Sequence, residues 1–212
     1  KYFSALKKLF NAKYVFEEPE KKNLLIFDGE SLNALKNILP GFDYFILETR
    51  LSRIKTIYIT PKIIISTLKN FKKNLFSSYL LSLIDSISPK VVFTFIDNSF
   101  KFSEMASQRH YKYKFVAIQN GARYEQKIFK ILSKKKIVGK NYLKFNIPNF
   151  FCFGENEVQD YKKNNQKIKK FIKVGSLRVS NFLFSKKKKL KKRPTNEILL
   201  ISDVYCWDLI LN

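Results

Sequence analysis

Short apolar runs alternate with stretches of helical periodicity along most of the chain. The runs show no in-and-out alternation, which is typical of strands buried on both faces of a parallel sheet. We expect strands at 23–27, 44–47, 56–59, 91–96, 114–118, 149–153, 171–174 and 197–201. We expect helices at 31–39, from Pro61 onward, and at 75–87, 100–108 and 155–163. The pattern predicts an α/β fold, a Rossmann-like doubly wound parallel sheet.

The same pattern divides the chain into segments. We expect an amphipathic lead-in helix at 1–22, a Rossmann-like domain at 23–184, a basic linker at 185–195 and the first strand of a second domain at 196–212. The chain begins with Lys1 rather than Met and ends soon after a predicted strand. We therefore expect a part of a longer protein in which a second domain has only begun.

Composition narrows the class of protein. Hydrophobic residues make up 45% of the 212 positions and apolar runs recur from Leu24 to Ile201, which excludes disorder over most of the length. Only two cysteines are present, which excludes a disulfide scaffold and fits a reducing compartment. No run reaches the roughly 18 apolar residues of a membrane span. We expect a cytoplasmic protein, with peripheral attachment to the inner face of the plasma membrane as a further option.

The excess of basic residues has two interpretations. A net charge of +24 is typical of proteins that bind nucleic acids, yet lysine far outnumbers arginine and the basic residues are spread over the whole length. The densest run, at 186–193, is expected to be a solvated linker that is also attracted to an anionic membrane surface. We therefore expect no specific nucleic-acid partner.

Polar residues follow several predicted strands, where ligands of open parallel sheets bind. The candidates are Asp28, Asp97, Asn98, Gln119, Asn120, Gly121, Arg123, Glu155, Ser176 and Arg178. Because the carboxyl ends of parallel strands share one edge, we expect these residues along one rim.

Two of these turns have the clearest chemistry. Asp97 can act as a base or bind a sugar hydroxyl, and the segment 97–99 can equally cap the helix that follows. The turn from Gln119 to Gly121, followed by Arg123, can offer backbone N–H groups and a guanidinium to a phosphate or carboxylate, or can be an ordinary Asn-Gly turn. The turns at Glu155 and Ser176 can likewise be helix caps.

Several familiar motifs are absent from the sequence. It holds no G-x-S-x-G elbow, no G-x-x-x-x-G-K-[ST] loop and no G-x-G-x-x-G after the first strand. The single histidine, His110, lies in a polar stretch without Cys or His partners at metal-binding spacing, and is expected at the surface. We expect neither a metal nor a cofactor.

Five segments, in order, carry a resemblance to a bacterial family of transferases called surface carbohydrate biosynthesis proteins. They are LIFDGES at 25–31, PKVVFTFIDN at 89–98, FVAIQNGAR at 115–123, FGEN at 153–156 and KVGSLR at 173–178. That family is similar to GT-B glycosyltransferases, in which two Rossmann-like domains face a cleft. The resemblance covers the chain from about residue 23 onward.

The resemblance implies a glycosyltransferase of surface polysaccharide or lipopolysaccharide biosynthesis. A nucleotide-sugar donor would bind mainly to the C-terminal domain, and a glycan or lipid-linked acceptor would face the N-terminal domain represented here. Asp97 would be a base or acceptor ligand, Gln119 to Arg123 would shape the cleft, and Ser176 and Arg178 would lie near the hinge. Relatives often carry a His where this chain has Asn120, so no His-based mechanism is implied. No bound metal is implied either.

Three other functions stay open at this point. The first is a nucleotide-sugar epimerase on the same fold, which would release its product without an acceptor. The second is a nucleic-acid-binding protein driven by the net charge, and the third is a non-catalytic scaffold.

Overall fold

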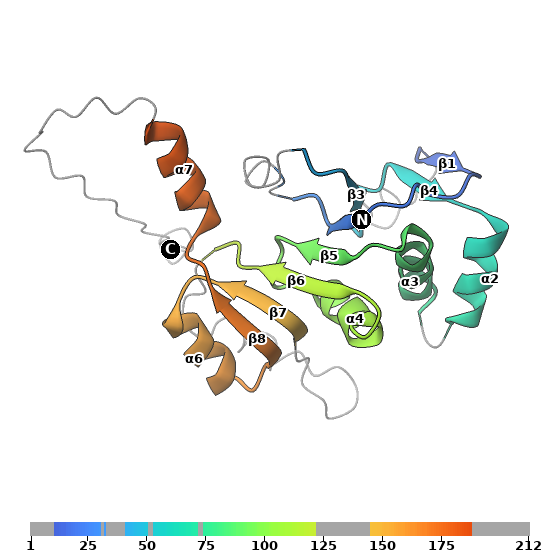
Figure 1. Cartoon of the computed structure of the whole chain (residues 1–212). Coiled ribbons are helices and arrows are strands. Elements are labelled where there is room, and N and C mark those ends of the chain that lie inside the picture. Colours follow the sequence, from blue (N-terminus) through green and yellow to red (C-terminus); the bar gives the residue numbers. More distant parts are fainter. Residues whose placement is uncertain are drawn as a thin grey trace, which may run out of the picture.

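A computed structural model describes residues 11–30, 32, 41–50, 53–71, 74–121 and 145–187. Its centre is a parallel six-stranded sheet with the order β3-β2-β5-β6-β7-β8 (Figure 1). The strands are β2 (Leu24–Phe27), β3 (Tyr44–Leu47), β5 (Val91–Thr94), β6 (Lys114–Ile118), β7 (Asn146–Cys152) and β8 (Lys167–Lys173). The fold is α/β and consistent with a Rossmann-like sheet flanked by helices, which confirms the predicted fold class at that level.

The strand order contains one reversal of direction. The chain passes from β2 to β3 on one side and then returns to β5 on the other side of β2. The same reversal occurs in doubly wound sheets of order 2-1-3-4-5, where ligands bind at the reversal. The ends of β2 and β5 are tied together because the Thr94 hydroxyl donates to the Phe27 carbonyl at 2.8 Å.

The helices begin where the sequence provides side-chain caps. They are α2 (Pro61–Lys69), α3 (Leu75–Ile87), α4 (Phe100–Arg109), α6 (Glu155–Lys163) and α7 (Leu177–Lys187). Thr60, Asn74 and Ser99 each accept a hydrogen bond from a backbone N–H in the first turn of α2, α3 and α4. The predicted cap at 97–99 is therefore supplied by Ser99.

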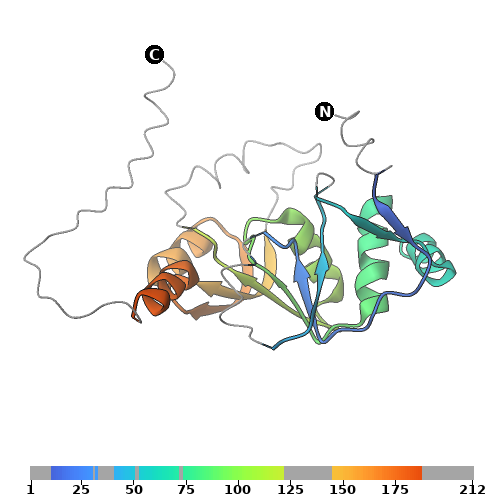
Figure 2. The same ribbon diagram turned by 90° about the horizontal axis from the view of Figure 1, so that it is seen from above.

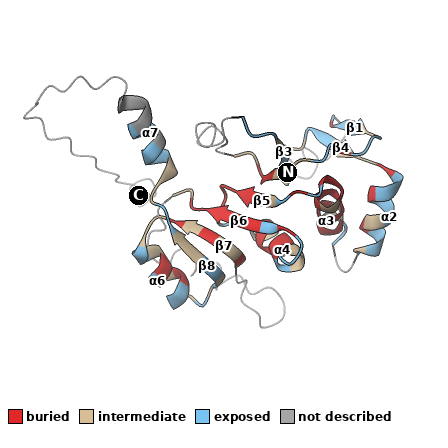
Figure 3. Cartoon of the chain, in the orientation of Figure 1, coloured by how far each residue is buried: buried red, intermediate tan, exposed pale blue. Residues whose placement is uncertain are grey.

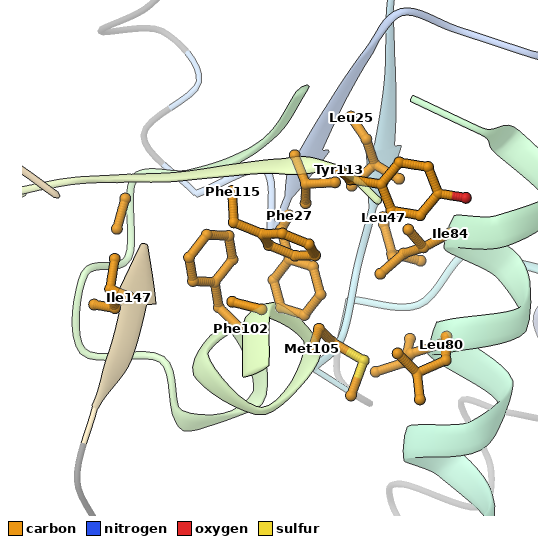
Figure 4. Close-up of a cluster of buried hydrophobic side chains, with 14 of the residues drawn as sticks. Leu25, Phe27, Leu47, Leu80, Ile84, Phe102, Met105, Tyr113, Phe115 and Ile147 are labelled. Carbon is orange, nitrogen blue, oxygen red and sulfur yellow. The ribbon is translucent and has the colours of Figure 1, made fainter. Parts of the chain in front are cut away.

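The main core lies between the sheet and helices α3, α4 and α6. Its centre is aromatic: the Phe102 ring meets those of Phe27 and Phe115 edge to face, at 5.6 and 5.5 Å between centroids (Figure 4). Buried residues are concentrated in the central strands and on the inner sides of α3 and α4 (Figure 3). A smaller cluster around Ile26, Phe93 and Val116 covers the opposite face of the sheet.

Two predictions at the N-terminal side are corrected by the structure. Lys13–Val15 form strand β1, so the lead-in helix expected over 1–22 does not include them. The expected strand at 56–59 forms as β4 (Thr56–Tyr58), but it pairs with β1 in a separate two-stranded parallel sheet rather than joining the main sheet. This ribbon lies beside α2 and α3 (Figure 2), where the backbone N–H of Tyr58 donates to the Tyr79 hydroxyl at 3.0 Å.

The C-terminal segments are described only in part. Helix α7 continues to Lys187, so the first three residues of the expected linker at 185–195 are helical. The rest of that linker, the strand expected at 197–201 and the helix expected at 31–39, except for Leu32, lie outside the described residues. Within the described part of the chain, no helix is both long and apolar enough to cross a lipid bilayer.

Candidate functional site

The candidate site lies at the carboxyl edge of the sheet, where the neighbouring strands β2 and β3 end. Asp28 follows β2 directly and has a φ of 61°, the left-handed conformation that Asp tolerates better than most residues. Its carboxylate is only 2% exposed. Oδ1 accepts from the backbone N–H of Thr49 at 2.7 Å, and the Thr49 hydroxyl lies 2.9 Å from both oxygens. Asp28 thus binds the turn after β3 to the end of β2.

A second carboxylate, Glu48, lies beside this pair. Its Oε1 accepts from the backbone N–H of Gly29 at 3.3 Å. A Cβ at position 29 would lie 2.9 Å from the same oxygen, so a glycine there allows the close approach. Its other oxygen, Oε2, is buried and has no hydrogen-bond partner among the described residues.

The protonation of Glu48 follows from these surroundings. Burial raises the pKa of the Glu48 carboxyl, and the negative charge of Asp28 raises it further. The Gly29 N–H and two arginines act in the opposite direction, but the pKa stays above its ordinary value. Glu48 is therefore a carboxyl group with an increased tendency to accept and hold a proton.

Two arginines close the corner between β2 and β3. The Arg50 guanidinium contacts the Glu30 carboxylate at 2.5 Å, and the Arg53 guanidinium lies 3.5 Å from the same oxygen. These ion pairs are partly exposed and each contributes little stability. They place two cationic groups at the same corner as Asp28 and Glu48.

A groove of about 880 Å³ runs from this corner along the edge strand β3 toward β4 and α3. Its wall is mostly apolar and aromatic, with Phe45, Leu47, Tyr58, Phe76, Tyr79 and Leu83. At the carboxyl end of β3 the lining changes to Glu48, Thr49 and Arg53. An apolar hollow with a few polar groups gathered at one end is the usual form of a small-molecule site.

Asp97 lies in the turn after β5 and is buried. It is 1% exposed, and its two oxygens accept from the Asn120 backbone N–H and the Tyr161 hydroxyl, both at 3.4 Å. The contacts join the turns after β5 and β6 to helix α6. This geometry favours a positioning role for Asp97 over direct contact with a ligand at the rim.

The turn after β6 is held by Gln119. This side chain is 1% exposed, accepts from the Phe153 N–H at 2.9 Å and donates to the Gly121 carbonyl at 3.0 Å. It therefore joins the ends of β6 and β7, which is a structural role. Oδ1 of Asn120 is buried without a hydrogen-bond partner among the described residues, so it has an unused acceptor. Arg123 lies outside the described residues.

The remaining predicted residues lie along the same edge with other contacts. Asn98 is exposed beside Asp97. Glu155, in the first turn of α6, pairs with Lys173 at 3.1 Å. The Ser176 hydroxyl accepts from the Val179 N–H at 3.4 Å, and the Arg178 guanidinium lies over the Phe95 ring at 5.9 Å from its centroid.

The structure therefore divides the predicted rim into two groups. Asp97, Gln119, Asn120 and Gly121 come together, whereas Asp28 lies beside two residues that the sequence analysis did not select. Those residues are Glu48 and Thr49. They follow β3 as the other candidates follow their strands, so the same rule applied to the strand at 44–47 would have found them.

The last observations on the site concern metal binding and similarity to known proteins. The described residues contain no group of three or more His, Cys, Asp or Glu side chains able to hold a metal ion. A scan against known protein families found no match, and searches of curated proteins and of solved structures also found none.

Proposed function

We propose that the chain is the acceptor-binding domain of a GT-B-like glycosyltransferase of bacterial surface polysaccharide or lipopolysaccharide biosynthesis. The observation that carries the proposal is the apolar groove that ends at the Glu48 carboxyl, at the carboxyl end of β3, because ligands of open parallel sheets bind at the carboxyl ends of the strands. The sequence resemblance at five collinear segments supports the same class.

The groove suits an acceptor with an apolar body and a reactive hydroxyl. The rings of Phe45, Tyr58 and Phe76 offer faces for a lipid chain or for the C–H face of a sugar. At the polar end, the Arg53 guanidinium can donate to hydroxyl or phosphate oxygens, and the Thr49 hydroxyl oxygen, whose proton goes to Asp28, can accept from an acceptor hydroxyl. The proposal therefore specifies a glycan or lipid-linked acceptor, with its nucleophilic hydroxyl at the Glu48 end.

In the proposed reaction, the acceptor oxygen bonds to the anomeric carbon of a nucleotide sugar. The bond from that carbon to the donor phosphate oxygen breaks, and the nucleotide leaves with the electron pair. The hydroxyl proton passes to the Glu48 carboxylate. A carboxyl group with a raised pKa is suited to that step. Asp97, the candidate base from the sequence, is buried below the rim, and we assign it the positioning of the Asn120 turn.

The test measures sugar transfer by the protein expressed from its complete reading frame. Labelled nucleotide sugars are offered together with an octyl glycoside, a probe that has both an apolar chain and sugar hydroxyls. Glu48→Gln is expected to reduce transfer by about 100-fold or more, the range for loss of a general base. Glu17→Gln makes the same change at an exposed carboxylate that does not line the groove, and is expected to leave transfer unchanged.

Two results would contradict the proposal. Equal rates of transfer by Glu48→Gln and by Glu17→Gln would show that the Glu48 end of the groove has no part in the reaction. Release of an epimerised nucleotide sugar in the absence of an acceptor would show that the protein is an epimerase rather than a transferase.

A further inference from the structure

In strands β7 and β8, side chains stop alternating regularly between the two faces of the sheet at one position near the amino edge. This interruption is called the slip below. Ile147 pairs with Ile168 and Asn149 pairs with Lys170, while Pro148 and Lys169 between them form no register pair. The core-facing residues on either side of the slip are three positions apart rather than two, as in Ile147 and Phe150. Pro148 lacks an N–H and cannot donate to the ladder, which accounts for the interruption.

The slip has a consequence for the lysines of β8. In a regular strand, successive side chains point to opposite faces, so one of two neighbouring lysines would turn toward the core. Here Lys169 and Lys170 are both exposed. Both also line a hollow of about 470 Å³.

The hollow is built from four segments around the amino ends of the strands. Lys90 precedes β5, and the loop from His110 to Tyr113 precedes β6. Lys114 and Phe115 are the first residues of β6, and β7 and β8 supply the rest. It is at the opposite edge of the sheet from the candidate acceptor site, because all six strands are parallel. Its occupant would therefore be separate from the proposed acceptor.

The positive charge around this hollow is only partly neutralised. Of the five lysines that line it, Lys112 pairs with Asp85 at 3.0 Å. In the part of the chain that the structure describes, the other four form no ion pair, and no Asp or Glu lines the hollow. They are Lys90, Lys114, Lys169 and Lys170. Like charges gathered around a concave surface strengthen the local potential and attract an anion.

The other lining residues narrow the ligand class. Tyr111 is 75% exposed and presents an amphipathic ring beside the lysines. The Asn149 amide is already used, because it donates to the Phe115 carbonyl at 2.9 Å. The ligand would thus be held mainly by ammonium groups, which act as point charges on phosphate oxygens.

We propose that this hollow, formed by the five lysines with His110 and Tyr111, binds a phosphate-bearing ligand with at least two negative charges. Such a group can come from a lipid headgroup, as in phosphatidic acid, or from a soluble phosphate such as pyrophosphate. The proposal does not depend on glycosyl transfer, so its test is independent of the activity.

The experiment compares two pairs of adjacent, exposed lysines. One variant carries Lys169→Gln and Lys170→Gln inside the hollow. The control carries Lys162→Gln and Lys163→Gln at the end of α6, outside the lining, and removes the same charge. Circular dichroism first establishes that both variants fold as the unchanged chain does.

Binding is measured with two probes at one fixed salt concentration. Inorganic pyrophosphate is titrated by calorimetry, and phosphatidylcholine vesicles with and without phosphatidic acid are used in co-sedimentation. With about 1 kcal/mol for each lysine, the hollow variant is expected to bind about 30-fold more weakly, and the control less than about threefold more weakly. If the hollow variant loses binding to pyrophosphate, the hollow is a site for soluble phosphates. If it keeps that binding and loses only its binding to vesicles with phosphatidic acid, the hollow is a site for lipid headgroups.

Two outcomes overturn the proposal. Equal weakening in both variants would show that binding follows from the overall charge of +24 rather than from the hollow. Absence of binding to both probes would show that the lysines do not form a phosphate site.

Discussion

The same chemical change at two threonines is expected to have opposite effects on stability. Thr49→Val removes the hydroxyl that lies 2.9 Å from both oxygens of Asp28, a carboxylate that is 2% exposed. Thr67→Val, in helix α2, removes a hydroxyl that is buried and has no hydrogen-bond partner among the described residues. Both substitutions keep a β-branched side chain of nearly the same volume, so the hydroxyl is the main difference.

The magnitudes follow from these contacts. A hydrogen bond to a charged group contributes about 1.5–3 kcal/mol, so Thr49→Val is expected to lower the free energy of unfolding by about 2 kcal/mol. Removing the unsatisfied hydroxyl of Thr67 is expected to raise it by as much as about 1 kcal/mol, because no bond is lost and a buried polar atom disappears. In an Asp28→Asn background, the cost of Thr49→Val should fall to about 1 kcal/mol, the value of a neutral hydrogen bond.

The assay is urea unfolding monitored by far-UV circular dichroism. The comparison requires that the free energy of unfolding depend on urea concentration with the same slope, the m-value, in each variant. The reasoning would be refuted if Thr49→Val and Thr67→Val changed the free energy of unfolding in the same direction by similar amounts. An undiminished cost of Thr49→Val in the Asp28→Asn background would show that the charge of Asp28 has no part in the effect.

Three further predictions concern the site and its pH dependence. Gly29→Ala places a Cβ 2.9 Å from Glu48 Oε1 and should lower the free energy of unfolding by about 1–2 kcal/mol, measured by the same urea titration. Glu48→Gln should raise the free energy of unfolding at pH 7 but not near pH 4, because the pKa of Glu48 is raised in the folded protein and its ionisation at higher pH therefore costs stability. A difference between variant and parent that does not change with pH would contradict this. Asp85→Ala should cost about 2–3 kcal/mol at pH 7, less than a fully buried pair, since it leaves Arg109 without its partner at 2.9 Å. Burial alone would raise the pKa of Asp85, but hydrogen bonds from Arg109 and its neighbours lower it, so this stability is present above about pH 4 and is lost as pH falls through the lowered pKa; thermal melts from pH 7 to pH 2 should show the variant and the parent converge.

Some strands and helices were predicted with accurate boundaries, whereas the strand expected at 91–96 ends at Thr94 and the strand expected at 149–153 spans Asn146–Cys152. The strands at 44–47 and 114–118 and the helix at 75–87 have the predicted ends. Strand β8 begins four residues earlier than expected, at Lys167. Four of its seven residues are lysines, which interrupt the apolar run from which a strand is predicted. Lysines of this kind are common on edge strands, where they discourage pairing with another chain.

The partner of each strand was much harder to predict. Residues 56–58 have the pattern of a strand, but nothing in that short segment indicates pairing with β1 rather than with the main sheet. The residues 13–15 that pair with them have too few apolar positions to predict a strand. Short strands acquire their conformation from a neighbour, so local sequence carries little information about them.

The order of apolar and polar residues by itself determined the α/β class, most of the elements and the turns at the carboxyl edge of the sheet. Only the tertiary structure decided which of those turns meet, because that depends on contacts between residues far apart in the chain. Asp28 and Thr49 are 21 positions apart, and they come together because β2 pairs with β3. The same pairing brings Glu48 beside Asp28 and raises its pKa through burial and a neighbouring charge, neither of which a linear pattern contains.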